Sequence, residues 1–173
     1  MIIPIKYNEL NEEFNYDLSL QMRLENYITK HFKPAYIIGQ LCPTYLLGGC
    51  IRDLINANYP KDLDIVVLGN ENIDFIKSII DKLNIEYTLN KFGGFKLKYN
   101  GLEIDLWLSD DLFSAIQYNV DGLFYDLSNK SLISLTFDNF IKNGIKEINP
   151  NNNIDNGRIK KLIKFEKEFK QKD

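Results

Sequence analysis

Leu46-Leu-Gly-Gly-Cys-Ile-Arg-Asp53 and, nine residues later, Asp62-Leu-Asp64 are the stretches that decide how this chain folds. In the first, two glycines end an apolar strand and open a helix, where backbone N–H groups and the helix dipole favour an anion. In the second, an apolar strand carries aspartates at positions i and i+2, which point to the same side. A phosphate-binding turn beside two carboxylates that suit a hard cation predicts nucleotide chemistry.

The composition of the chain is that of one globular domain. A chain of 173 residues is long enough to form a hydrophobic core. Its composition, 45% hydrophobic and 26% charged, is that of an ordered globular protein. No apolar run approaches the ~18 residues of a membrane span, and Met1-Ile-Ile-Pro-Ile-Lys6 does not resemble a signal peptide. Cys42 and Cys50 have no metal-ligand spacing. We therefore expect a cytoplasmic protein that does not bind membranes.

The hydrophobic periodicity predicts alternating helices and strands. Helices are expected over residues 17–32, 50–55, 72–83 and 154–170, a buried strand over 63–68, and hairpins around Asn100-Gly101 and Ser128-Asn-Lys130. Along the strand that follows Gly101, alternation places Glu103, Asp105 and Trp107 on one face. Everything before residue 150 is interpreted as one α/β domain.

The two motifs resemble those of a known family. Gly48-Gly49-x-x-Arg52-Asp53 and Asp62-x-Asp64 are similar to the catalytic head of the tRNA nucleotidyltransferase (CCA-adding) and bacterial poly(A) polymerase family, in the DNA polymerase β-like superfamily. The resemblance implies an α/β (α+β) fold in which helices flank a mixed, mainly antiparallel sheet. It implies a head at residues 1–150, with an N-terminal helical segment at 1–34, and a truncated neck-like helix at 151–173.

Three further segments resemble the family. Asp105 lies where the family has a third acidic residue, and Gly122-Leu-Phe-Tyr-Asp126 resembles another of its segments. Asp155-Asn-Gly-Arg158 resembles the neck motif whose Asp and Arg read the incoming base.

The chain also departs from the family pattern. It has Ile116-Gln117-Tyr118 in place of an Arg-Asp-Phe segment that helps to bind the nucleotide, and Asp121 in place of an Asn. From the resemblance, we expect the chain to reach only about as far as the start of the neck, without the body and tail that grip tRNA in the family. A partner chain or self-association is one expected source of such domains.

The resemblance assigns a role to each candidate residue. Asp62, Asp64 and Asp105 are the catalytic metal ligands, for two Mg²⁺ ions or alternatively Mn²⁺, with Asp105 on the metal that activates the acceptor hydroxyl. Gly48 and Gly49 hold the β- and γ-phosphates, Arg52 adds a charge-assisted contact, and Asp53 orients Arg52. Asp155 and Arg158 bind the nucleotide through its base.

Three functions remain open on the sequence. The first is transfer of a nucleoside monophosphate from ATP or CTP to an acceptor hydroxyl, with an RNA or tRNA 3′ end as the expected acceptor. The second is the same chemistry on a small molecule or a protein hydroxyl. The third is a catalytically degenerate module that binds nucleotide, RNA or protein. The missing Arg-Asp-Phe segment favours the third, whereas three crowded carboxylates oppose it, because they are costly without a neutralising metal.

Overall fold

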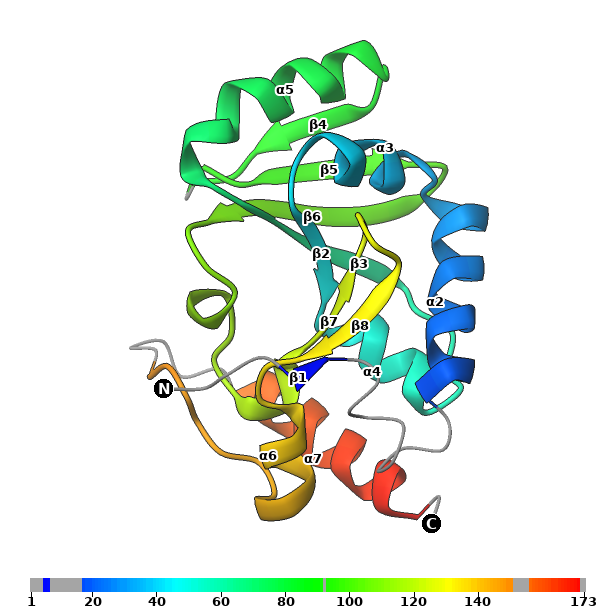
Figure 1. Cartoon of the computed structure of the whole chain (residues 1–173), viewed down its shortest axis with the longest axis vertical. Coiled ribbons are helices and arrows are strands. Elements are labelled where there is room, and N and C mark those ends of the chain that lie inside the picture. The colour runs from blue at the N-terminus through cyan, green and yellow to red at the C-terminus, as the bar shows by residue number, and fades with distance from the viewer. Residues whose placement is uncertain (1–4, 7–16, 92, 151–155, 172–173) are drawn as a thin grey trace.

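The computed structural model describes residues 5–6, 17–91, 93–150 and 156–171. Within these ranges the strands form one sheet in the order β1-β8-β7-β2-β3-β6-β5-β4 (Figure 1). All neighbouring strands are antiparallel except β3 and β6, which are parallel. The mixed, mainly antiparallel sheet is thus confirmed. The strands are β1 (Ile5–Lys6), β2 (Thr44–Leu47), β3 (Asp62–Leu68), β4 (Glu86–Leu89), β5 (Phe95–Tyr99), β6 (Leu102–Ser109), β7 (Leu123–Asp126) and β8 (Ser131–Ser134).

The helices surround this sheet. They are α2 (Asp17–His31), α3 (Pro34–Leu41), α4 (Gly49–Ile55), α5 (Ile73–Lys82), α6 (Phe137–Asn143) and α7 (Asn156–Lys170). Single 3₁₀ turns lie at η1 (Asn70–Asn72), η2 (Phe113–Ala115) and η3 (Asn119–Asp121). In Figure 1, α5 lies at one end of the long axis, and α6 and α7 at the other.

Helix α3 was not expected from the sequence. Its first residue is Pro34, shortly after the end of α2 at His31. Proline is well tolerated at that position, because its missing N–H would have no partner inside the helix and its φ already suits one. Pro34 therefore both follows one helix and begins the next.

The two hairpins form as expected. Strands β5 and β6 pair antiparallel with Tyr99 opposite Leu102, and Asn100 and Gly101 adopt φ of 50° and 81°. Positive φ at both central residues is what the predicted type I′ turn requires. Strands β7 and β8 form the second hairpin. The edge strand β4 was not predicted, because it is mostly exposed and shows no clean alternation.

The faces of the sheet carry two separate cores. On one face Leu63, Ile65 and Val67 of β3 are fully buried in the larger cluster, which includes residues of α2, α4 and α5. On the other face Val66 is buried in a smaller cluster with residues such as Phe124. Because side chains alternate along a strand, the aspartates of β3 share the face of the smaller cluster. The site therefore lies where this second core ends.

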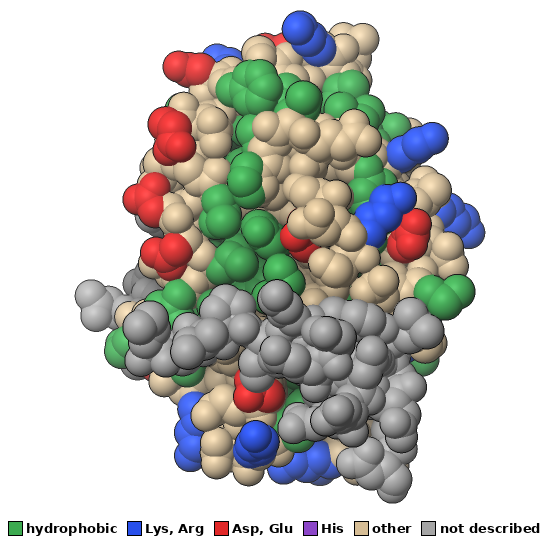
Figure 2. Space-filling model, in the orientation of Figure 1, with side chains coloured by type: hydrophobic (Ala, Val, Ile, Leu, Met, Phe, Trp, Pro, Cys, Tyr) green, Lys and Arg blue, Asp and Glu red, His purple; other side chains and the backbone are tan. Residues whose placement is uncertain are grey.

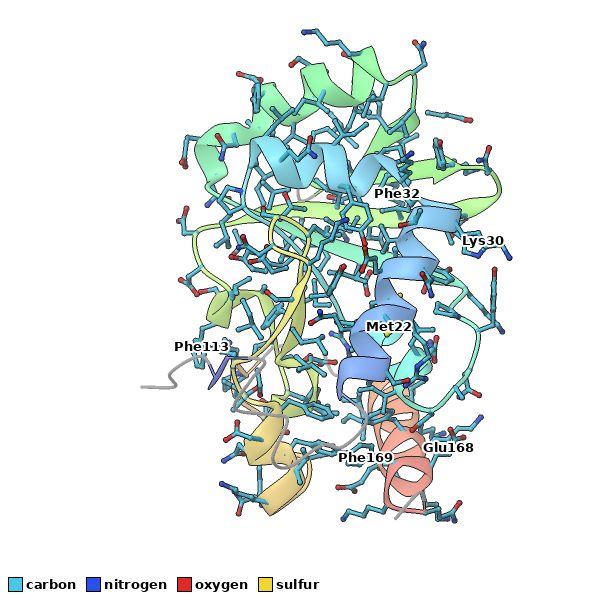
Figure 3. The ribbon with its side chains drawn as sticks, turned by 45° about the vertical axis from the view of Figure 1, so that its right-hand side comes forward. Met22, Lys30, Phe32, Phe113, Glu168 and Phe169 are labelled. Atoms are coloured by element: carbon cyan, nitrogen blue, oxygen red, sulfur yellow. The ribbon has the colours of Figure 1, made fainter. Side chains whose placement is uncertain are left out.

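The C-terminal helix α7 packs against the head. Leu162 is fully buried, and Phe165 stacks on Phe169 with ring centroids 5.7 Å apart. Phe169 points towards α6, where its ring centroid lies 5.8 Å from that of Phe140 (Figure 3). Asn56, which follows α4, donates a hydrogen bond to the Phe165 carbonyl at 3.4 Å. The apolar stripe of the helix is thus used within the chain.

Apolar side chains also reach the surface. They gather on the upper part of the face shown in Figure 2, with acidic side chains along its left edge. Among the helices in the described ranges, no helix has the length and apolar character needed to cross a membrane.

Candidate active site

The three predicted carboxylates lie on neighbouring strands in the middle of the sheet. Asp64 of β3 is directly opposite Asp105 of β6 in the parallel pair, and Asp62 is opposite Glu103. Residues paired in this way point to the same face, so all four acidic side chains share it. The strand order thus brings Asp105 beside the Asp-x-Asp motif, as the family resemblance implied.

Asp64 is the most buried of the three carboxylates. Burial, followed by the charges of Asp105 and Asp62, raises its pKa from 3.8 to about 6, while Arg52 and Arg158 lower it. Partial desolvation raises the pKa of Asp105, and the neighbouring Lys96 lowers it. Burial is thus the main cause of both shifts and the neighbouring carboxylates add to it, so a cation among them would favour their charged forms.

Gly48 allows the chain to pass close to Asp64. It caps the N-terminus of α4 with φ 79° and ψ −139°, a conformation that side chains rarely adopt. A Cβ atom at Gly48 would lie 3.0 Å from Oδ2 of Asp64. Gly49 begins the seven-residue helix α4, and a Cβ there would meet only Nη2 of Arg52, at 3.6 Å. Of the two glycines, Gly48 is therefore the one at which a side chain would disturb the site.

Arg52 forms an ion pair that the sequence did not predict. Its guanidinium Nη1 donates to Oδ1 of Asp121 on η3, and the two side chains are 14% and 4% exposed. The sequence interpretation gave the orienting role to Asp53, which is half-buried on α4 and whose pKa is raised by burial and lowered by Arg52. The carboxylate that pairs with Arg52 in the structure is instead Asp121 of η3, which is 69 positions away in the sequence.

A cavity of about 220 Å³ adjoins these residues. Its walls include Gly48, Asp64, Trp107, Asp121 and Arg158. The Arg158 side chain thus comes back from α7, at the far end of the sequence, to the same place as the glycine turn. Asp155, its predicted partner in base recognition, lies outside the described residues.

A second cavity, of about 170 Å³, lies beside the first along the sheet. It is lined by residues of β4, β5 and β6, including Lys96, Glu103 and Asp105. Asp64 and Asp105 therefore line different hollows although they are paired in register. Asp62, at the start of β3, is exposed.

The carboxylates offer the hard oxygen ligands that Mg²⁺ prefers, and the strand register places them as neighbours. Their side chains are not gathered into a ligand set: across the described residues, no three His, Cys, Asp or Glu side chains are grouped closely enough to hold a metal ion. The strand register thus suits a metal site. To bind an ion, however, the side chains of Asp62, Asp64 and Asp105 have to rotate towards a common point. The metal ligands remain a prediction.

Trp107 and Asp121 are among the cavity residues that were not assigned a role from the sequence. Alternation from Asp105 already placed Trp107 on the same face, so its position next to the site could have been inferred. Asp121 was noted only as a departure from a family pattern. No local signal pairs it with Arg52, because the two are 69 positions apart.

The comparisons with known proteins concern structure alone. No protein-family model matches the chain, and no curated protein matches its sequence. A solved CCA-adding enzyme in complex with ATP matches with a TM-score of 0.56 at 23% identity, over 98% of this chain and 43% of that one. A tRNA-processing enzyme in an apo form matches with a TM-score of 0.58 at 20% identity, over 80% of this chain and 45% of the other.

The CCA-adding enzyme of Thermotoga maritima, solved with tRNA, gives a TM-score of 0.54 at 21% identity, over 86% of this chain and 37% of that one. The chain thus spans less than half the length of each of these proteins. At such identities the likeness concerns the fold. The chain has a tRNA nucleotidyltransferase-like fold.

Proposed function

We propose that this chain is a metal-dependent nucleotidyltransferase of the CCA-adding and poly(A) polymerase type. The observation that carries the proposal is the register of β3 and β6, which sets Asp64 opposite Asp105, together with the close approach of the backbone at Gly48, where an added Cβ would lie 3.0 Å from Oδ2 of Asp64. Neighbouring carboxylates beside a glycine turn with positive φ are an arrangement that suits a nucleoside triphosphate and a divalent cation. ATP and CTP are the proposed donors.

The reaction is an in-line displacement. The acceptor hydroxyl oxygen forms a bond to the α-phosphorus, and the bond from that phosphorus to the pyrophosphate oxygen breaks. Asp62, Asp64 and Asp105 would hold two Mg²⁺ or Mn²⁺ ions, whose charge stabilises the attacking and leaving oxygens. Asp105, on the open side of the cluster, accepts the proton of the hydroxyl.

The remaining residues position the donor. Gly48 and Gly49 present backbone N–H groups to the β- and γ-phosphates. Arg52 is held by Asp121, so a phosphate contact from Arg52 has to compete with this ion pair. Arg158 lines the cavity and is placed to contact the base, with Asp155 as its proposed partner.

An RNA 3′ end, such as that of tRNA, is the proposed acceptor, with a small-molecule or protein hydroxyl as the alternative. Further RNA contacts would come from a partner chain or a second copy. Both cysteines are free thiols, which fits the proposed cytoplasmic location.

The test is transfer of α-³²P-labelled ATP, CTP, GTP and UTP into total cellular RNA in the presence of Mg²⁺. The Asp62→Asn/Asp64→Asn variant removes the acidic pair, and Asp74→Asn/Asp81→Asn removes the same charge from exposed positions of α5. We expect label in RNA with the wild type and the α5 variant and none with the β3 variant. Label on a protein or small molecule would change the acceptor only, whereas no labelled product under any metal condition would refute catalysis by this chain alone.

A binding module without catalysis is the second candidate. It is favoured by the ungrouped carboxylates and by the use of Arg52 in an internal ion pair. In that case nucleotide would raise the melting temperature equally with and without Mg²⁺. In an active site, the rise in melting temperature with nucleotide should require Mg²⁺ and should be lost in the Asp62→Asn/Asp64→Asn variant. The reason is that a ligand raises the melting temperature only when it binds the folded protein.

A further inference from the structure

Asp121 is a buried carboxylate of which only one oxygen is used. Its side chain is 4% exposed, and Oδ1 accepts from the Arg52 guanidinium. Oδ2 is buried as well, and no hydrogen-bond donor reaches it from the residues that the structure describes. A buried acceptor in this state costs free energy that a new donor would recover.

The position of Asp121 determines which donors can reach it. The residue lines the cavity of about 220 Å³ that Gly48, Asp64 and Arg158 also line. A group that enters this cavity therefore lies next to the Asp121 side chain.

We propose that Asp121 is a specificity-determining residue that accepts a hydrogen bond, through Oδ2, from a neutral donor group of the nucleotide. The donor is a hydroxyl of the sugar or an amino group of the base, since an ionised carboxylate is an acceptor only. The cavity would thus take this donor group against Asp121, next to the glycine turn that we propose for the phosphates. This inference rests on the proposed function of the site.

Arg52 has a different role in this view from the one that the sequence predicted. It fixes the orientation of Asp121 through Oδ1, which leaves the other oxygen for the ligand. In this pair Arg52 has a structural role, and Asp121 recognises the ligand. A hydrogen bond to a charged group discriminates strongly, because a ligand that lacks the donor leaves the carboxylate oxygen buried without a partner.

The experiment compares the affinity of four triphosphates for the wild-type chain by calorimetry in Mg²⁺. They are ATP, 2′-deoxy-ATP, 3′-deoxy-ATP and purine riboside triphosphate, which lacks the amino group of the base. The first two analogues remove one hydroxyl each, so that the series distinguishes the sugar from the base. We expect one analogue to bind roughly 10- to 100-fold more weakly than ATP, and the other two to bind within about threefold of it.

Asp121→Asn tests the residue directly. The asparagine oxygen keeps the contact to Arg52, which turns the amide NH₂ towards the place of Oδ2, so that an acceptor becomes a donor. ATP and the discriminated analogue should then bind equally. Asp126→Asn is the matched control, because Asp126 is a buried aspartate on β7 whose oxygens accept from Ser128 and Asn129 instead. This variant should keep the wild-type discrimination.

The outcomes separate the inference from the function on which it rests. If ATP binds and all three analogues bind equally well to the wild type, the role of Asp121 is refuted and the proposed function stands. The same holds if Asp121→Asn keeps the discrimination. If neither ATP nor CTP binds the wild type, under conditions where urea unfolding shows that it is folded, the nucleotide function is refuted and the inference with it.

Discussion

Replacing Gly48 by alanine tests the geometry of the glycine turn. The backbone there has φ 79° and ψ −139°, which lies near a region that is almost exclusive to glycine. Holding a residue with a side chain in this conformation costs about 1–3 kcal/mol. The added Cβ would also lie 3.0 Å from Oδ2 of Asp64, so this carboxylate has to move. We therefore expect Gly48→Ala to lower the free energy of unfolding by about 1–3 kcal/mol.

Gly49 provides the matched control one residue later. It lies in α4 without a positive φ, and its Cβ would meet only Nη2 of Arg52, at an ordinary contact distance of 3.6 Å. Alanine is favoured over glycine in a helix by about 0.5–1 kcal/mol. Gly49→Ala should therefore leave stability unchanged or raise it slightly.

The assay is urea unfolding of the three proteins in EDTA, followed by far-UV circular dichroism. For a chain of this length, about 1 kcal/mol corresponds to roughly 2–4 °C in melting temperature, which gives an independent reading. Equal stabilities for the two variants would refute the reasoning, since it depends on the difference between the two backbone conformations. If Gly49→Ala were destabilised and Gly48→Ala were not, the order of stabilities would be the opposite of the one expected.

Two further predictions concern the carboxylate cluster and the last helix. Because the pKa of Asp64 is about 6 in the folded state and 3.8 ordinarily, its contribution to stability is fully present below about pH 4 and is lost as the pH rises through 6. In EDTA, Asp64→Asn should therefore match the wild type in urea unfolding at pH 4 and exceed it by about 2–3 kcal/mol at pH 8, and equal curves at both pH values would contradict this. Leu162→Ala, at a fully buried position of α7, should cost about 2–5 kcal/mol, while Ile163→Ala, at a residue 52% exposed, should change the free energy of unfolding by less than about 0.5 kcal/mol. Similar losses in both α7 variants would indicate that the helix does not pack as described.

Much of the fold could be predicted because its signals are local. The hairpin at Asn100 and Gly101 follows from two residues that tolerate positive φ, and the buried strand β3 from a continuous apolar run. Strand β4 could not be predicted, because an exposed edge strand is defined by its partner β5 and not by its own pattern. Helix α3 was missed because proline is compatible with both the end and the start of a helix.

For the site, the sequence by itself determined which residues share a face and where a glycine is needed. Spacing of two along a strand places Asp62 with Asp64 and Asp105 with Trp107, whatever the rest of the chain does. These relations are set by the backbone over a few residues.

The tertiary structure alone decided which of these local pieces meet. The order of the strands sets Asp64 opposite Asp105, and the packing of η3 and α7 brings Asp121 and Arg158 to the same cavity. The pairing of Arg52 with Asp121 joins residues 69 positions apart, and such contacts depend on how whole elements pack. Short-range sequence patterns carry no record of that packing, because its free energy comes from surfaces that become neighbours only when the chain has folded.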